Sequence, residues 1–174
     1  MAFLCLALRF QIYIQIYQML RIVISDTSTL ILFHKIEHLS LLKKVYGELT
    51  TTPEIAEEFG EELPKWIKVE LVSDKKYQNF LETQVDLGEA SAIALAKEFD
   101  NNTLLLLDDL KARKLALKLN LKITGTLGII HKAKQMGIIG KVKPLIDLLL
   151  ETDFRISNRI VEEILILNNE NTRH

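Results

Sequence analysis

Two short apolar runs, each followed at once by acidic residues, constrain the fold more than any other feature of the chain. Residues 22–25 (Ile-Val-Ile-Ser) lead into Asp26, and the leucines at 104–107 lead into Asp108 and Asp109. Apolar runs of this length without alternation are typical of strands buried on both faces, as in parallel sheets covered by helices. In such sheets ligands bind beyond the carboxyl ends of the strands, so we expect these acids to share one crevice.

Helical and strand-like stretches alternate along the rest of the chain, as they do in βαβ units. We expect helices at residues 28–36, 39–46, 75–83, 87–99, 110–119, 125–136, 142–150 and 158–167, with another opened by Pro53 at its first position. Further strands are expected at residues 48–52, 66–72 and 121–124. The pattern predicts an α/β fold in one domain, residues 22–168, followed by a frayed polar tail at 169–174.

Residues 1–21 do not fit this pattern. The stretch is apolar but is interrupted by Arg9 and three glutamines, so it lacks a clean membrane span of about 20 residues. It also lacks the basic start and small-residue cleavage site of a signal peptide. Met19 lies just before the first strand. The leading interpretation is therefore a start codon set too far upstream, with a packed extension and a membrane or export segment as alternatives.

Composition narrows the functional classes. Hydrophobic residues make up 48% of the 174 positions, enough for a full core, and the formal net charge of −1 excludes a strongly basic DNA-coating protein. The single Cys5 excludes a disulfide framework and a cysteine zinc site, and favours the cytoplasm. From residue 110 to residue 143 there is no acid, whereas Lys111, Arg113, Lys114 and Lys118 are basic. This stretch is a candidate phosphate-binding surface, with an ordinary solvated helix face as the alternative.

Several carboxylates are expected to converge. Asp26, Asp108 and Asp109 follow strands, Glu89 begins an apolar helix, and Glu58 lies on the helix opened by a proline. Converging carboxylates repel one another unless a cation binds, and hard oxygen ligands suit Mg²⁺ or Mn²⁺. Such an ion can orient a water for attack on a phosphodiester. The carboxylates therefore predict a metal-dependent phosphodiesterase site.

Two of these acids also have a structural interpretation as helix caps. Asp26 could cap the helix that follows it, although Thr27 and Ser28 already offer capping hydroxyls. The stretch from Asp86 to Glu89 matches an aspartate form of the capping box. Both interpretations stay open at the level of sequence.

The remaining acids are open in the same way. Glu57 and Glu58 could form only a solvated helix face. Of Asp108 and Asp109, one is expected to face the site and the other to cap the next helix. Thr126 follows the strand expected at 121–124 and is a further candidate for contact with substrate.

Five stretches in this order resemble the PIN-domain family, and within it the VapC-like branch of prokaryotic toxin nucleases, in a subgroup filed as a domain of unknown function. They are Ile24-Ser25-Asp26-Thr27-Ser28, Pro53-Glu54-Ile55-Ala56-Glu57-Glu58-Phe59, Gly88-Glu89-Ala90, Leu107-Asp108-Asp109 with Ala112-Arg113, and Gly125-Thr126-Leu127-Gly128. The likeness spans residues 22–167. Each stretch is weakly diagnostic alone, and the ordered set is more specific. Many family members have proline where this chain has Thr29.

The resemblance implies a three-layer α/β/α domain with a mostly parallel sheet. It also implies an Mg²⁺- or Mn²⁺-dependent endoribonuclease, dimerisation, and neutralisation by a small antitoxin protein, without stable membrane association. By this likeness Asp26 is the first metal ligand, Glu58 and Glu89 are the second and third, and Asp108 or Asp109 is the fourth. Ser28 is the hydroxyl that orients Asp26 or a water.

Two other functions compete with a nuclease. A non-catalytic module could keep the fold and bind RNA or protein, but all four carboxylate positions are intact. A receiver-like phosphoacceptor also combines paired aspartates with parallel strands. Its acid pair normally follows the first strand, whereas here the pair follows the strand at 104–107. The nuclease is therefore the leading hypothesis.

Overall fold

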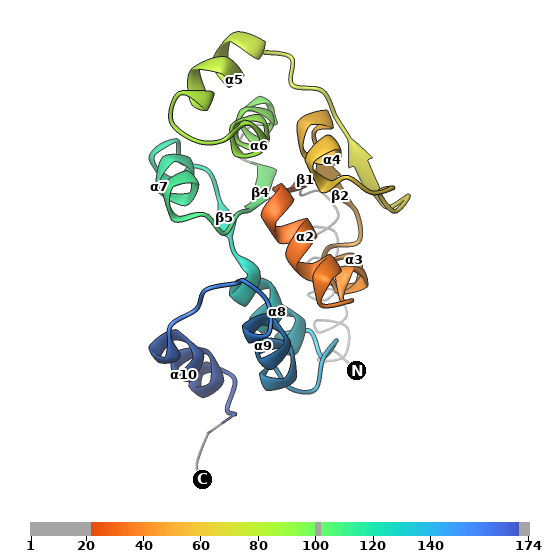
Figure 1. The fold of residues 1–174 in the computed structure, drawn as a ribbon, viewed down its shortest axis with the longest axis vertical. Coiled ribbons are helices and arrows are strands. Elements are labelled where there is room, and N and C mark those ends of the chain that lie inside the picture. Colours follow the sequence, from red (N-terminus) through yellow and green to blue (C-terminus); the bar gives the residue numbers. More distant parts are fainter. Residues whose placement is uncertain (1–21, 100–101, 171–174) are drawn as a thin grey trace, which may run out of the picture.

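The computed structural model describes residues 22–99 and 102–170, so the expectation for residues 1–21 lies outside the described residues. Five parallel strands form one sheet in the order β3-β2-β1-β4-β5 (Figure 1). The strands are β1 (Ile22–Ser25), β2 (Leu49–Thr51), β3 (Ile67–Val69), β4 (Thr103–Leu106) and β5 (Ile123–Thr124). The α/β class predicted from the sequence is confirmed.

Nine helices belong to the described ranges, and they cover the sheet on both sides. They are α2 (Thr27–Lys35), α3 (Leu39–Tyr46), α4 (Pro53–Phe59), α5 (Lys75–Glu82), α6 (Leu87–Glu98), α7 (Leu110–Lys118), α8 (Thr126–Gln135), α9 (Lys143–Leu150) and α10 (Asn158–Leu167). Helices α6 and α7 pack together on one side, against β4 and β5, while α3 packs on α8 on the other (Figure 1). This is the expected three-layer α/β/α arrangement.

The pairing of β1 with β4 fixes the position of the acids that follow these strands. Ile22 lies opposite Thr103 and Ser25 opposite Leu106, in parallel register. The backbone N–H of Asp26 then donates to the carbonyl of Leu106 (3.1 Å), one step beyond the last paired residues. The acids after β1 and β4 therefore leave the sheet at the same edge.

The two edge strands are shorter than the sequence predicts. At β5 the reason is local: the backbone N–H of Leu121 donates to the carbonyl of Ala116 (3.0 Å), which keeps Leu121 in the turn that ends α7. Asn120 has a positive φ of 60° in this turn. At β3 the pairing with β2 ends at Val69, and residues 70–72 lie outside the strand.

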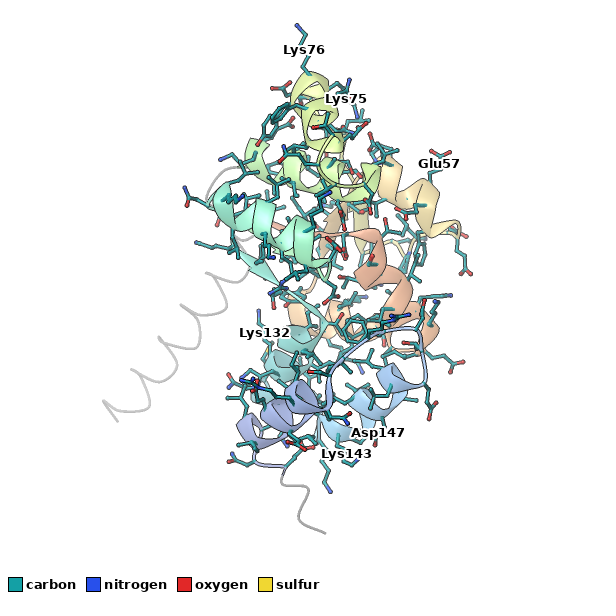
Figure 2. The ribbon with its side chains drawn as sticks, turned by 60° about the vertical axis from the view of Figure 1, so that its left-hand side comes forward. Glu57, Lys75, Lys76, Lys132, Lys143 and Asp147 are labelled. Atoms are coloured by element: carbon teal, nitrogen blue, oxygen red, sulfur yellow. The ribbon has the colours of Figure 1, made fainter. Side chains whose placement is uncertain are left out.

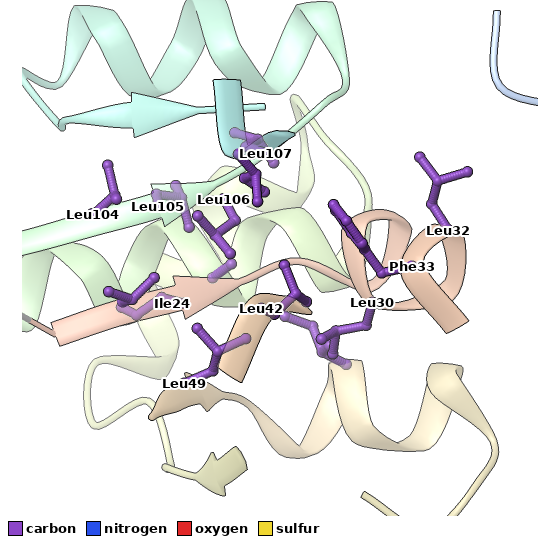
Figure 3. Close-up of a cluster of buried hydrophobic side chains, with 14 of the residues drawn as sticks. Ile24, Leu30, Leu32, Phe33, Leu42, Leu49, Leu104, Leu105, Leu106 and Leu107 are labelled. Carbon is purple, nitrogen blue, oxygen red and sulfur yellow. The ribbon is translucent and has the colours of Figure 1, made fainter. Parts of the chain in front are cut away.

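Leucine and isoleucine side chains from the strands meet those of α2 and α3 in the core (Figure 3). Ile24, Leu49 and Leu105 come from three neighbouring strands, and all are fully buried, as is Phe33 of α2. Helix α6 is buried from Gly88 to Ala96, as its apolar sequence predicts. Burial on both sides of β1 and β4 anchors the strand ends that carry the acids.

Helices α8, α9 and α10 gather at one end of the molecule (Figure 1). The polar residues after α10 were expected to fray, but the first of them are held. Asn168 is buried, and its Oδ1 accepts from Nδ1 of His131 (2.8 Å). The carboxylate of Glu170 accepts from the backbone N–H groups of Val142 (2.7 Å) and Lys143 (3.0 Å) at the start of α9. Glu170 is therefore held in place, because it satisfies N–H groups that a helix start leaves unpaired, and residues 171–174 of the expected tail lie outside the described residues.

No helix within residues 22–99 and 102–170 is long and apolar enough to span a membrane.

Candidate active site

Asp26 lies at the end of β1 and is 1% exposed. Its Oδ1 accepts from the backbone N–H of Thr29 (2.9 Å), so Asp26 caps α2, which was one of the interpretations that the sequence left open. Its Oδ2 is buried and has no hydrogen-bond partner within the described ranges. Burial, with a smaller contribution from the charge of Asp108, raises the pKa of Asp26 to about 7. One oxygen therefore stabilises the helix, and the other is left without a donor.

Asp108 and Asp109 divide two roles between them. The Oδ1 of Asp109 accepts from the backbone N–H groups of Lys111 and Ala112, both at 2.8 Å, and caps α7. Asp108 accepts instead from Thr126, through its backbone N–H (2.9 Å) and its hydroxyl (2.6 Å). The prediction that one of this pair caps the following helix is confirmed for Asp109.

Glu89 is a capping residue that also faces other carboxylates. Its backbone N–H donates to Oδ1 of Asp86 (2.8 Å), and its Oε2 accepts from the backbone N–H of Asp86 (3.3 Å), which confirms the capping box. Burial raises the pKa of Glu89 to about 7, and the negative charges of Asp86, Asp109 and Asp26 add to the effect. The helix cap and the carboxylate group therefore share this side chain.

Glu58 lies in the last turn of α4, and its Oε2 accepts from the hydroxyl of Thr27 (2.6 Å). A Cβ at position 88 would lie 2.8 Å from that oxygen and 3.0 Å from the threonine hydroxyl, so the close approach of α6 depends on Gly88. Glu57 points away from the body of the molecule (Figure 2). Of the two glutamates, only Glu58 lies against the end of β1.

The carboxylates gather around two adjoining hollows. Asp26, Ser28, Glu58 and Glu89 line a small one together with Thr27 and Asp86. Ser28 also lines a larger pocket, in which Asp108 and Asp109 form part of the wall. The structure therefore brings all the predicted carboxylates to one edge of the sheet.

The expected metal cluster is nevertheless not closed. As the side chains are placed, the described part of the chain has no group of three His, Cys, Asp or Glu residues that could hold a metal ion. The other acids of the site accept hydrogen bonds from protein donors: Glu58 from Thr27, Asp108 from Thr126, and Asp109 and Glu89 from backbone N–H groups. The donor chemistry still fits Mg²⁺ or Mn²⁺, because the donors are carboxylate oxygens and the Oδ2 of Asp26 is buried and unsatisfied.

The residues expected to bind substrate fall into two groups. Lys111, Lys114 and Lys118 are exposed on α7. Arg113 is half-buried and its Nη1 donates to the carbonyl of Leu107 (2.8 Å), while Thr126 is fully buried beneath Asp108. The three lysines therefore form a cationic surface, and Arg113 and Thr126 instead support the end of β4.

Several residues near the site were not indicated by the sequence, among them two cationic side chains and an aromatic one. Lys35 on α2 and Phe154 and Arg155 in the loop between α9 and α10 line the larger pocket beside Asp108. The two segments lie more than a hundred positions apart, so local patterns could not connect them. The only usable signal was an aromatic residue next to an arginine in a loop between two amphipathic helices.

A family model described as a PIN domain matches residues 22–170, which is most of the chain. No curated protein and no solved structure matches the chain. PIN domains have a fold of nuclease type, commonly act as nucleases with divalent metals, and are associated with nucleic-acid binding. The matched range covers every strand and helix described above, together with the carboxylates at the sheet edge. The chain therefore belongs to the PIN-domain family.

Proposed function

We propose that the protein is a metal-dependent endoribonuclease and the toxin of a toxin–antitoxin pair, as its likeness to VapC-type nucleases suggests. The observation that carries the proposal is the buried Oδ2 of Asp26, which lacks a donor at the point where the other carboxylates meet. An unsatisfied buried oxygen is costly unless a proton or a cation binds it. Membership of the PIN family supports nuclease activity in general, and the Oδ2 of Asp26 offers a ligand for the cation.

Asp26 and Asp108 would hold the metal ion from the two strand ends, with Glu89 and Glu58 completing the set. A divalent cation supplies a water of lowered pKa and offsets the charge that develops on the phosphodiester. Thr126 orients Asp108 through two hydrogen bonds, and Thr27 orients Glu58 through one. The exposed Ser28, at the mouth of both hollows, lies where it can orient the attacking water.

The exposed lysines of α7 provide the contact with RNA. Because Asp109 caps α7, this helix begins at the carboxylates, and the surface formed by Lys111, Lys114 and Lys118 starts beside the scissile bond. Phosphate groups are the ligands that such a surface attracts.

The same helix offers a surface to a protein partner. Leu110 and Leu117 are 65% and 57% exposed and lie seven positions apart, on one side of α7. We propose that a small antitoxin, or the second copy in a homodimer, covers them. An antitoxin bound there would also cover the lysines and so exclude RNA.

A non-catalytic RNA-binding module is the second candidate function. It is favoured by one observation, the lack of a ready metal-binding group of three side chains among the described residues. The two functions differ in whether the carboxylates draw together around a cation.

Cleavage of labelled single-stranded RNA in Mg²⁺, Mn²⁺ or EDTA separates them, with Glu58→Gln compared with Glu57→Gln. The two variants remove the same charge from neighbouring positions, of which only Glu58 faces the site. We expect Glu58→Gln to lose at least tenfold in kcat/KM, which corresponds to about 1.4 kcal/mol of transition-state stabilisation, and Glu57→Gln to match wild type. RNA binding without cleavage in any metal would establish the binding module.

A further inference from the structure

Beside the carboxylates lies the larger hollow, and the proposed hydrolysis assigns no role to its walls from α2 and from the loop between α9 and α10. It has a volume of about 500 Å³, within the range of sites for small ligands. One wall comes from α2, with Ile31, Leu32 and Lys35, and another from the loop between α9 and α10. Asp108 and Asp109 also line it, so the hollow adjoins the carboxylates.

The loop wall is held in place by a long-range ion pair and a local turn. Lys35 donates from Nζ to Oδ1 of Asp153 (3.0 Å), across 118 positions of sequence. The backbone N–H of Phe154 donates to the hydroxyl of Thr152 (3.0 Å), which itself donates to the carbonyl of Leu149 (2.7 Å). Phe154 is half-buried and packs against the core. The aromatic wall is therefore fixed by the fold.

The hollow combines an apolar surface with a cation that the protein does not neutralise. Ile31, Leu32 and Phe154 provide the apolar part. The neighbouring Arg155 is exposed and makes no ion pair with any described residue, whereas the charge of Asp153 is offset by Lys35. An aromatic surface beside a free guanidinium suits an unpaired nucleobase with its phosphate. The acids Asp108 and Asp109 in the wall disfavour a phosphate inside the hollow, so the base is the part that would enter.

We infer that this hollow is a subsite for one nucleotide of single-stranded RNA next to the scissile phosphate, with the base against Phe154 and a phosphate at Arg155. The inference rests on the proposed nuclease function for the position of the scissile phosphate. It adds a requirement for unpaired RNA, because a base within a duplex cannot enter a hollow of this kind.

The test measures binding of a fluorescein-labelled single-stranded RNA oligonucleotide by anisotropy in EDTA, and its cleavage in Mg²⁺. The variants are Phe154→Leu, Phe154→Trp and Arg155→Gln, and the matched controls are Phe80→Leu and Arg159→Gln. Phe80 is exposed on α5, and Arg159 pairs with Glu163 on α10, so both controls lie outside the hollow. Phe154→Trp keeps an aromatic surface and serves as the rescue.

We expect Phe154→Leu to weaken binding about 5- to 150-fold, the range for loss of one stacked base, and Phe154→Trp to restore it. Arg155→Gln should lower the slope of log K against log salt by about 0.7, the value for one phosphate of a single strand. Both controls should bind as wild type does. Equal binding by Phe154→Leu, Arg155→Gln and their controls would overturn the subsite, as would a loss in Phe154→Leu that Phe154→Trp does not restore.

Cleavage tells the two proposals apart. If wild type cuts RNA and the pocket variants cut at the same rate, the subsite is wrong and the nuclease stands. If wild type cuts nothing but Phe154→Leu still loses binding with rescue by tryptophan, the nuclease is wrong, and the hollow stands as a nucleotide subsite without a scissile phosphate beside it. A duplex RNA that binds as tightly as the single strand would also overturn the subsite.

Discussion

Substituting Asp26 by asparagine should change the pH dependence of stability in a way that few other substitutions can. The carboxyl is buried, its pKa is raised from 3.8 to about 7, and one of its oxygens has no donor among the described residues. Asparagine keeps an oxygen for the N–H of Thr29 and caps helices as well as aspartate does. The substitution therefore removes the charge and keeps the cap.

The magnitude follows from the proton that the native state retains. Between pH 3.8 and about 7 the unfolded chain has released this proton and the native protein still holds it, so the free energy of unfolding falls as pH rises. Each pH unit in this window removes about 1.36 kcal/mol, so about 2.7 kcal/mol is lost from pH 5 to pH 7. Above pH 7 the loss is complete. Glu89, whose pKa is also raised to about 7, acts in the same direction.

The Asp26→Asn variant should lack the part of the pH dependence of unfolding free energy that comes from Asp26. Without metal at pH 8 we expect Asp26→Asn to be more stable than wild type by about 1–3 kcal/mol, because part of the gain is offset by burying the NH₂ group. At pH 5 the advantage should disappear or reverse. Adding Mg²⁺ at pH 8 should stabilise wild type, by about 2.7 kcal/mol at a hundredfold excess over Kd, and leave the variant unchanged.

Urea unfolding followed by circular dichroism, in EDTA at pH 5, 6, 7 and 8, measures these free energies directly. Asp147→Asn is a suitable control, because Asp147 is exposed on α9 and pairs with Lys143 far from the carboxylates (Figure 2). A wild-type stability that stays level or rises from pH 5 to pH 8 in EDTA would refute the reasoning. So would a variant with the same pH dependence as wild type.

Two further predictions test the surroundings of the site. Gly88→Ala should lower kcat/KM for RNA cleavage by at least tenfold, because the added Cβ would displace Glu58. Gly140→Ala, whose Cβ would lie in open space, should cut RNA as wild type does, and equal rates for the two variants in a steady-state assay would contradict the prediction. Replacing the three exposed lysines of α7 by alanine should lower the slope of log K for RNA binding against log salt by about 2, at about 0.7 per phosphate. The control is a triple alanine variant at Lys43, Lys44 and Lys141, and an unchanged slope in anisotropy titrations would place the RNA elsewhere.

The sequence predicted the parts of the site that depend on periodicity and on strand ends. The apolar runs before Asp26 and Asp108 are typical of buried parallel strands, and parallel register then brings their ends together. The capping box at Glu89 could also be predicted, because a helix cap involves residues that are close in the sequence.

What the sequence could not predict depends on contacts between distant segments. Whether Arg113 faces solvent or the carbonyl of Leu107 is decided by how α7 sits on β4. The loop with Phe154 packs against the core, and its Asp153 pairs with Lys35 of α2; no local pattern encodes contacts over that separation. Strand β5 is short because the backbone N–H of Leu121 bonds to the carbonyl of Ala116 at the end of α7, which keeps Leu121 out of the strand.

The double use of Asp26 has a genetic consequence. A single-base change converts an aspartate codon to an asparagine codon, and here that change would keep the start of α2 intact while removing a charge from the proposed metal site. Cells harmed by an uncontrolled nuclease of this kind would have a one-step escape that leaves a folded protein, still able to occupy RNA and its inhibitor. Among survivors of overexpression that still make full-length protein, replacement at codon 26 should therefore recur, and sequencing of such clones would test this.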